Sequence, residues 1–357
     1  MKSTVRPRPA VSTFVAAVIA IASTSVTSYA QQDPAEAPEL AEAQEQEVVS
    51  LAQIVAAALR GQIVPTDEPF GWANDFLKSD QQTTFVPFTL SVEQATVSTP
   101  TVAMYVFVAP PDAPAADAPA ADAPAADADA AEPLPEPAFE DAYHVDLGAP
   151  TADGVYEIRR GFWVPAGDYD IYVALSESGV PDGTEAKTMM LKKALSVPDL
   201  WSDQLATSSV IQAASIEPLA APLAPDQVLA NPYVMGLMRI VPKNTTEYGT
   251  SDELSLLFLI YNVGVTASGM PDVGVEYTFN TRGPGGDEYF NATTPQAFDD
   301  QTLPQNFDLL AGDQLVAGQA IPLSGFPPAS YRLEIKITDN TNDASLVRNV
   351  DFSVAAP

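Results

Sequence analysis

The chain has 357 residues, a formal net charge of −31 and no cysteine. Such acidity argues against binding to nucleic acids or anionic membrane surfaces, both of which select Lys and Arg. The absence of cysteine excludes disulfide bonds, so an exported fold would be held together by core packing alone. The length allows two domains, each with a core of its own.

Residues 1–30 have the features of a secretory signal peptide. Three basic residues lie among the first eight, an apolar run follows at 11–22, and Ser28-Tyr29-Ala30 places small residues at the cleavage positions. The run is too short to cross a bilayer comfortably, which disfavours the alternative of an uncleaved membrane anchor. We therefore expect a secreted or periplasmic protein with no membrane span after signal cleavage.

Two segments precede the first predicted strand. Residues 31–47 are rich in Ala, Glu, Gln and Pro and contain no base, a composition that predicts a disordered acidic segment. Apolar residues at 48, 51, 55, 58 and 59 share one helical face, and Gly61 is a plausible stop. We predict a short amphipathic helix over 48–61 that caps the edge of a sandwich, with docking to a partner protein as the alternative.

Domain one is expected at 70–214. Its predicted strands alternate apolar and polar residues and span 83–92, 101–109, 142–147, 156–164, 169–175 and 188–197. Pro165-Ala166-Gly167 predicts a hairpin turn between two of these strands. The sequence DAPAA occurs three times over 112–126, so we expect a disordered Ala/Pro/Asp insert at 109–138 between two strands of this domain.

Domain two is expected at 227–357, after a Pro/Ala-rich linker at 215–226. Its predicted strands span 233–241, 253–262, 273–281, 315–323, 330–339 and 346–354. The glycine-rich sequence GPGG at 283–286 predicts a turn, because it lies between strands and lacks the Lys-Ser/Thr of a phosphate-binding loop.

The two domains share a repeated pattern. VPAGDYDIYVAL at 164–175 and FPPASYRLEIKI at 326–337 each place a Pro four residues before a Tyr and then alternate apolar with polar residues. Tyr169 and Tyr331 occupy the same place in the two copies. We interpret the chain as all-β, with two tandem Ig-like β-sandwich domains, a short N-terminal helix and disordered acidic segments.

The stretches at 71–92, 231–242, 310–323 and 325–354 resemble a family. They are similar to uncharacterised secreted bacterial proteins with Ig-like modules, of the kind linked to GWxTD or von Willebrand factor A-type proteins. The chain has Asn74-Asp75 where GWxTD has Thr-Asp, and it lacks the metal-binding DxSxS of a von Willebrand A domain. The resemblance implies an exported β-sandwich protein and carries over neither an activity nor an ion-dependent adhesion site.

Motifs for chemistry are sparse. His144 is the only histidine, and because no G-x-S-x-G elbow accompanies it we interpret it as a surface residue. Without cysteine a zinc site is disfavoured, and we expect no catalytic residue, no metal and no cofactor. Clustered carboxylates leave structural calcium open, with candidates at Asp153, Asp168, Asp170, Asp182, Asp299 and Asp300. A hydrolase with an acidic pair is a remaining alternative.

Aromatic residues are the better functional candidates. Alternation in 156–164 turns Trp163 outward on the same sheet face as Glu157 and Arg159, where it could contact a protein or stack on a glycan. The alternative is that the other domain or the insert covers it, while Trp72 and Trp201 plug sandwich ends. We therefore expect a non-enzymatic binding or structural module of the bacterial cell envelope, with protein contacts favoured and a carbohydrate-binding module as the alternative. Its partner would be an envelope protein or glycan, and not nucleic acid.

Overall fold

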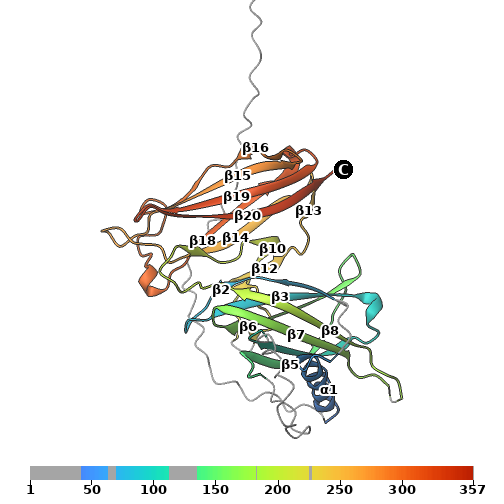
Figure 1. Cartoon of the computed structure of the whole chain (residues 1–357). Coiled ribbons are helices and arrows are strands. Elements are labelled where there is room, and N and C mark those ends of the chain that lie inside the picture. Colours follow the sequence, from blue (N-terminus) through green and yellow to red (C-terminus); the bar gives the residue numbers. More distant parts are fainter. Residues whose placement is uncertain (1–41, 63–69, 112–134, 182, 225–226, 357) are drawn as a thin grey trace, which may run out of the picture. The chain divides into compact units, whose positions relative to one another are not determined.

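The computed structural model describes residues 42–62, 70–111, 135–181, 183–224 and 227–356 (Figure 1). The expected signal peptide, residues 31–41 of the acidic segment and residues 112–134 of the insert lie outside these ranges. The chain forms two compact units. The N-terminal unit contains the described residues up to 203 together with 218–239, and the C-terminal unit contains 204–217 together with 240–356.

The N-terminal unit is a sandwich of two antiparallel sheets. One sheet has the order β1-β3-β2, with β6 pairing β3, and the other has the order β5-β4-β7-β8. The strands of the first are β1 (Gly71–Asn74), β2 (Leu77–Lys78), β3 (Thr84–Glu93) and β6 (Val155–Val164). Those of the second are β4 (Thr101–Ala109), β5 (Phe139–Asp146), β7 (Gly167–Glu177) and β8 (Thr188–Val197). A short 3-10 helix, η1 (Gln94–Thr96), follows β3.

Period-two alternation builds the core of this sandwich. Phe88 and Leu90 on β3 are buried, as are Ile158 and Phe162 on the neighbouring β6, so one face of the pair is almost wholly apolar. The facing sheet supplies Val106 and other inward residues of β4, β7 and β8 to the same cluster. The predicted strand positions in this unit therefore reflect burial of one sheet face.

The predicted hairpin at Pro165-Ala166-Gly167 is wrong. β6 pairs β3 and β7 pairs β4 and β8, so the turn carries the chain from one sheet of the sandwich to the other. A Pro-Gly turn fixes a reversal of direction but not which strand becomes the partner. Both β6 and β7 have buried faces, and each finds its partner elsewhere in the chain.

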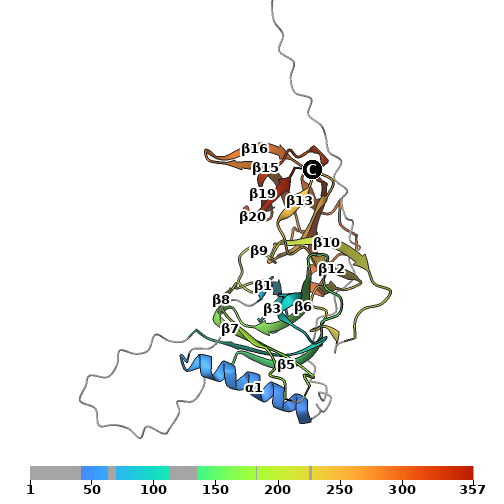
Figure 2. The same cartoon turned by 90° about the vertical axis from the view of Figure 1, so that its right-hand side faces the viewer.

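Helix α1 (Glu42–Leu59) lies across the outer face of the second sheet, as Figure 2 shows. It contacts β4 and β7, and its most buried residues are Leu51 and Val55. The helix therefore covers a sheet face instead of capping an edge, and it begins inside the segment 31–47 that was predicted to be disordered. Ala, Glu and Gln in that segment are also good helix formers, and acids in the first turn favour a helix N-terminus.

The C-terminal unit is a second sandwich. One sheet has the order β11-β12-β10-β14-β18, with β9 pairing β14. Its strands are β9 (Ala206–Thr207), β10 (Ile211–Pro218), β11 (Val234–Met235), β12 (Met238–Pro242), β14 (Glu253–Tyr261) and β18 (Leu315–Pro322). The other sheet, in the order β13-β20-β19-β15-β16 with β17 on β15, contains β13 (Glu247–Gly249), β15 (Val273–Gly283), β16 (Gly286–Ala292), β17 (Gln296–Phe298), β19 (Ala329–Asp339) and β20 (Ala344–Ala355). β11 and β12 pair as an antiparallel hairpin, and the remaining elements are the 3-10 helices η3 (Leu309–Ala311) and η4 (Leu323–Gly325).

Both units share the strand connections of the immunoglobulin fold. In the N-terminal unit β3 pairs β6, while β4 pairs β5 and β7, and β7 pairs β8. In the C-terminal unit β14 pairs β18, while β15 pairs β16 and β19, and β19 pairs β20. The same order B, C, C′, E, F, G across two sheets defines an Ig-like sandwich. The prediction of an all-β chain with two such sandwiches is confirmed.

The boundary between the units does not fall at the expected linker 215–226. All of β10 except its last residue, Pro218, belongs to the C-terminal unit, whereas 218–239 groups with the N-terminal unit. A Pro/Ala-rich composition suits a strand end and an irregular packed segment as well as it suits a linker. No helix in the described part of the chain is both long and apolar enough to span a bilayer.

Candidate functional site

The three predicted contact residues share the outward face of β6. Ile158 and Phe162 point into the core, whereas the side chains of Glu157 and Arg159 keep 23% and 29% of their surface exposed. Arg159 forms an ion pair with Glu157, and Trp163 is half-buried. The alternation in the sequence thus placed these residues on the correct face.

Trp163 is packed against a second aromatic ring on this face. The ring centroids of Trp163 and Phe85 are 5.1 Å apart, and the two residues are register partners on β6 and β3. Gly161 makes room for Phe85, because a Cβ atom there would lie 2.5 Å from the Phe85 ring. The Trp163 indole therefore packs against Phe85 on one side.

Residues 232–233 cover a further part of the same face. Tyr233 is only 3% exposed, and its hydroxyl donates a 3.0 Å hydrogen bond to Oδ2 of Asp75. Burial, followed by the negative charge of Asp75, raises the pKa of Tyr233 far above its ordinary value. Thr89 and Arg159 also interact with Tyr233, so the face around Arg159 is partly closed by a segment of the same unit.

The other two tryptophans differ from each other. Trp72 stacks on Phe88 at a centroid distance of 4.6 Å and packs against the core. Trp201 remains 37% exposed, with Lys78 Nζ 4.3 Å from its ring centroid. Its indole N–H donates to the carbonyl oxygen of Thr83, which fixes the ring at the protein surface.

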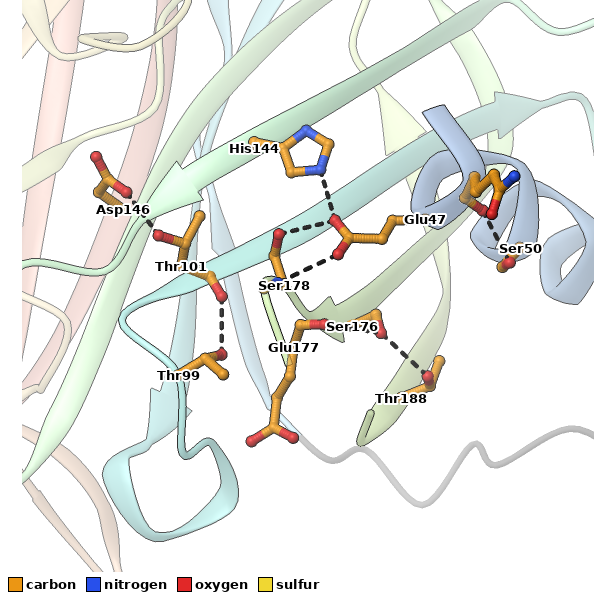
Figure 3. Close-up of polar contacts among 12 residues, drawn as sticks. Glu47, Ser50, Thr99, Thr101, His144, Asp146, Ser176, Glu177, Ser178 and Thr188 are labelled. Atoms are coloured by element: carbon orange, nitrogen blue, oxygen red, sulfur yellow. Dashed lines mark hydrogen bonds and ion pairs between the residues drawn. The ribbon is translucent and has the colours of Figure 1, made fainter. Parts of the chain in front are cut away.

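His144 lies beneath helix α1 instead of on the open surface (Figure 3). Only 10% of its side chain is exposed, and its Nε2 is 2.8 Å from Oε2 of Glu47 on α1. The same Glu47 oxygen accepts a 2.7 Å hydrogen bond from the hydroxyl of Ser178, and Oε1 accepts one of 3.2 Å from the backbone N–H of Gly179. No local sequence pattern predicts this cluster, because Glu47 precedes His144 by 97 residues.

The order of groups in this cluster suits a tether and not a nucleophile. In a Ser–His–carboxylate triad the imidazole lies between the hydroxyl and the carboxylate and takes the hydroxyl proton. Here Glu47 is in the middle, and both His144 and Ser178 bind to it. Burial alone would raise the pKa of Glu47, but the hydrogen bonds from Ser178, His144 and Gly179 together hold it below its ordinary value.

The carboxylates considered for calcium do not gather into one site in the described residues, where no group of three or more metal-ligating side chains occurs. Asp170 instead pairs with Lys192 at 3.0 Å. Asp299 accepts hydrogen bonds from the backbone N–H groups of Gln301 and Thr302 and closes a turn. Asp182 lies outside the described residues.

A second exposed surface lies on the outer face of the C-terminal sheet β13-β20-β19-β15-β16. Tyr289 on β16 is 69% exposed and stands opposite Asn280, whose other register partner is Arg332 on β19. Arg332 binds Asp351 at 2.8 Å and Asp287 at 3.2 Å. Sequence reasoning missed this surface because β16 lacks a run of alternating apolar residues.

Comparisons with known proteins find distant structural likenesses. No family model matches the chain, and no curated protein matches it. Trypsin-activated alpha-2-macroglobulin from Escherichia coli shows 14% identity and a TM-score of 0.21. A Salmonella alpha-2-macroglobulin mutant and the native E. coli protein each show 12% identity and a TM-score of 0.19. Each match covers 82% of this chain, but the chain spans only 16–17% of those proteins, and a likeness this distant carries no argument about function.

Proposed function

We propose that the chain is an exported, non-enzymatic module of the bacterial cell envelope that contacts a partner protein through the outer face of its C-terminal sheet. The observation that carries this proposal is the exposed ring of Tyr289 on the same sheet face as Arg282 and Arg332. Each of these two guanidinium groups forms an ion pair with Asp351. Tyr and Arg are the side chains most enriched, with Trp, among residues that dominate protein–protein binding energy.

The arginines are held in place before any partner arrives. Arg282 donates to Asp351 at 2.7 Å, and Arg332 binds both Asp351 and Asp287. The hydrogen bonds from Arg332 lower the pKa of Asp351, so this carboxylate stays charged at neutral pH. Such preorganisation reduces the side-chain entropy lost on binding.

The charge balance of this surface supports a protein partner. Although the whole chain carries a formal charge of −31, the basic residues Arg282, Arg332 and Lys336 on this face are each paired with an acid. A nearly neutral face avoids the repulsion that the rest of the surface would exert on an acidic envelope protein. We infer a partner that offers an apolar patch for Tyr289 flanked by oxygen acceptors for the guanidinium groups.

The free edge of β16 supports binding through the face instead of strand addition. β16 ends the sheet order, but a β-bulge interrupts its pairing with β15, and Asp287 and Glu288 add charge. Bulges and charged residues are the features that protect exposed edges from pairing with another strand. We therefore infer that a partner contacts the side chains of this face and does not add a strand to the sheet.

Site-specific photocrosslinking tests the proposal. A photoreactive amino acid would replace Tyr289 in the full chain, and Leu310 would serve as the control because it is 95% exposed but lies on η3. We expect one discrete crosslinked envelope protein from position 289 and none from position 310. The R332A variant, with the probe at 289, should reduce the yield at least several-fold.

Two outcomes would overturn the proposal. The first is equal crosslinking from positions 289 and 310, which would indicate random collisions. The second is glycan binding by the full chain that is lost in Trp163→Ala and retained in Tyr289→Ala, which would move the function to the carbohydrate alternative.

A further inference from the structure

The attachment of α1 to the N-terminal sandwich combines an apolar contact with one polar contact. Among the described residues of the helix, only Leu51 and Val55 are fully buried. Five others are partly buried against the sheet: Val48, Ala52, Ile54, Ala58 and Leu59. Val49 turns away from the sheet with 54% of its surface exposed. The apolar contact is therefore an amphipathic face along one side of the helix.

One carboxylate supplies the polar part of the attachment. All three groups that bind Glu47 belong to the sandwich: His144 on β5, and Ser178 and Gly179 directly after β7 (Figure 3). An ionised carboxylate accepts all three hydrogen bonds strongly, whereas protonation turns one oxygen into a donor and weakens the bonds that the group accepts. The protonation state of a single side chain thus controls this contact.

We propose that α1 is a detachable cover over the outer face of sheet β5-β4-β7-β8, held closed by Glu47 and released by acid. This inference concerns the N-terminal unit and is independent of the proposed function of the C-terminal sheet.

The surface that the helix covers is apolar and aromatic. It includes Ala103, Tyr105, Phe107, Tyr172, Ala174 and Met190, all buried. Tyr105, Phe107 and Tyr172 form a row of neighbouring rings with centroids 6.4–6.5 Å apart. Departure of α1 would open a contiguous hydrophobic surface of the kind that marks an interaction site.

The other acidic groups of α1, β5 and β7 do not bind Glu47. Asp146 on β5 accepts from the hydroxyl of Thr101, and the carboxylate of Glu177 points away from Glu47 in Figure 3. Glu140 on β5 accepts from the hydroxyl of Tyr105 at 2.5 Å. Glu42 and Glu45 lie in the first turn of α1 itself, where they favour the helix N-terminus.

The direction of the pH effect follows from Glu47. Its pKa in the folded protein is lower than the ordinary value of 4.5. A lowered folded-state pKa gives a stabilisation that is fully present above pH 4.5 and is lost as the pH falls through the folded-state value. The cover should therefore be closed at neutral pH and open as the pH falls through this lowered pKa.

Hydrogen exchange of the full-length chain measures this opening directly. Amide exchange in 48–59 would be followed from pH 7 to pH 3.5, corrected for the intrinsic pH dependence, and compared with exchange in β7. We expect protection of α1 to fall at least tenfold at low pH while β7 keeps its protection. Glu47→Gln should show the open-state exchange at every pH, whereas Glu45→Gln, on the same helix, should behave like the wild type.

Either of two results would overturn the inference. One is an α1 that keeps its protection at pH 3.5, or in Glu47→Gln at pH 7. The other is loss of protection in α1 and β7 at the same pH, which would show acid unfolding of the whole sandwich. The Ser178→Ala variant distinguishes a weakened tether from misfolding, because it removes one donor and should shift the opening to higher pH without abolishing it.

Discussion

The hydroxyl of Tyr331 donates a 2.6 Å hydrogen bond to the carbonyl oxygen of Pro327, four residues before it. In the other sandwich, Tyr169 makes the same contact with Pro165 at 3.0 Å. Both tyrosines lie near the start of the strand that corresponds to F in the Ig fold, where a tyrosine corner is characteristic. The Pro-to-Tyr spacing that recurs in the sequence therefore corresponds to the same hydrogen bond in each sandwich.

Tyr331→Phe should destabilise the C-terminal unit by about 1 kcal/mol, because the ring stays packed while the hydrogen bond is lost. Urea unfolding of the full chain, followed by a probe in each unit, measures this change. Tyr169→Phe should lower the midpoint of the N-terminal unit instead. Equal midpoints for Tyr331→Phe and the wild type would show that the hydrogen bond contributes nothing.

Gly318→Ala should cost about 1–3 kcal/mol, the range for overpacking a closed site. A Cβ atom at position 318 would lie 2.8 Å from the backbone oxygen of Leu256, which cannot move without disturbing the β14–β18 ladder. Gly274→Ala is the matched control in the same unit, since no atom lies within 4 Å of its Cβ position. Thermal unfolding should show a lowered Tm for Gly318→Ala and no loss for Gly274→Ala.

Glu177→Gln should destabilise the N-terminal unit by about 1.5–3 kcal/mol at pH 7, the range for a hydrogen bond to a charged group. Glu177 is 3% exposed and accepts bonds from the backbone N–H and hydroxyl of Ser98 and from the backbone N–H of Lys187. Burial opposes ionisation, but these bonds prevail and lower the pKa of Glu177 below 4.5.

The stabilisation by Glu177 is therefore present above pH 4.5 and is lost as the pH falls through the lowered pKa. The difference in unfolding free energy between wild type and Glu177→Gln should shrink as the pH falls from 5 to 3. Glu185→Gln changes an exposed acid near the same loop and should leave the profile unchanged. A constant difference across this range would contradict the assignment.

Tyr289→Ala and Phe290→Ala should have opposite effects on stability and binding. Tyr289 is 69% exposed, so its loss should change stability by less than about 0.5 kcal/mol while it weakens partner binding. Phe290 packs against Phe326 and Tyr331, so its loss should cost about 3 kcal/mol. Chemical unfolding and the crosslinking yield separate the two, and similar unfolding costs would contradict the described orientation of β16.

Alternation along the sequence predicted the strands well wherever one face is buried. Strands 101–109 and 188–197 match β4 and β8 residue for residue. β16 was missed because most of it is exposed, so no apolar alternation marks it. The partner of β6 was predicted wrongly because strand pairing depends on distant segments, whereas a turn motif reports only on its own residues.

The candidate contacts were predicted less completely. Period-two alternation placed Trp163 on the outer face of β6, but Phe85 and Tyr233, which pack on that face, come from other segments. The Glu47–His144 contact could not be predicted, because it joins a helix residue to a strand residue 97 positions later in the sequence. Pairwise contacts over such separations leave no local pattern in the sequence.

The two units exchange portions of chain, since 204–217 belongs to the second and 218–239 returns to the first. Cutting the chain at any single position would therefore remove residues from at least one of the two units. A fragment ending at 217 would lose Tyr233 and leave Asp75 without its hydroxyl donor, while a fragment starting at 240 would lose β10 and expose the edge of β14. Neither sandwich can therefore be excised by a single cut, and a fragment intended to keep both needs helix α1 as well as residues 70–356.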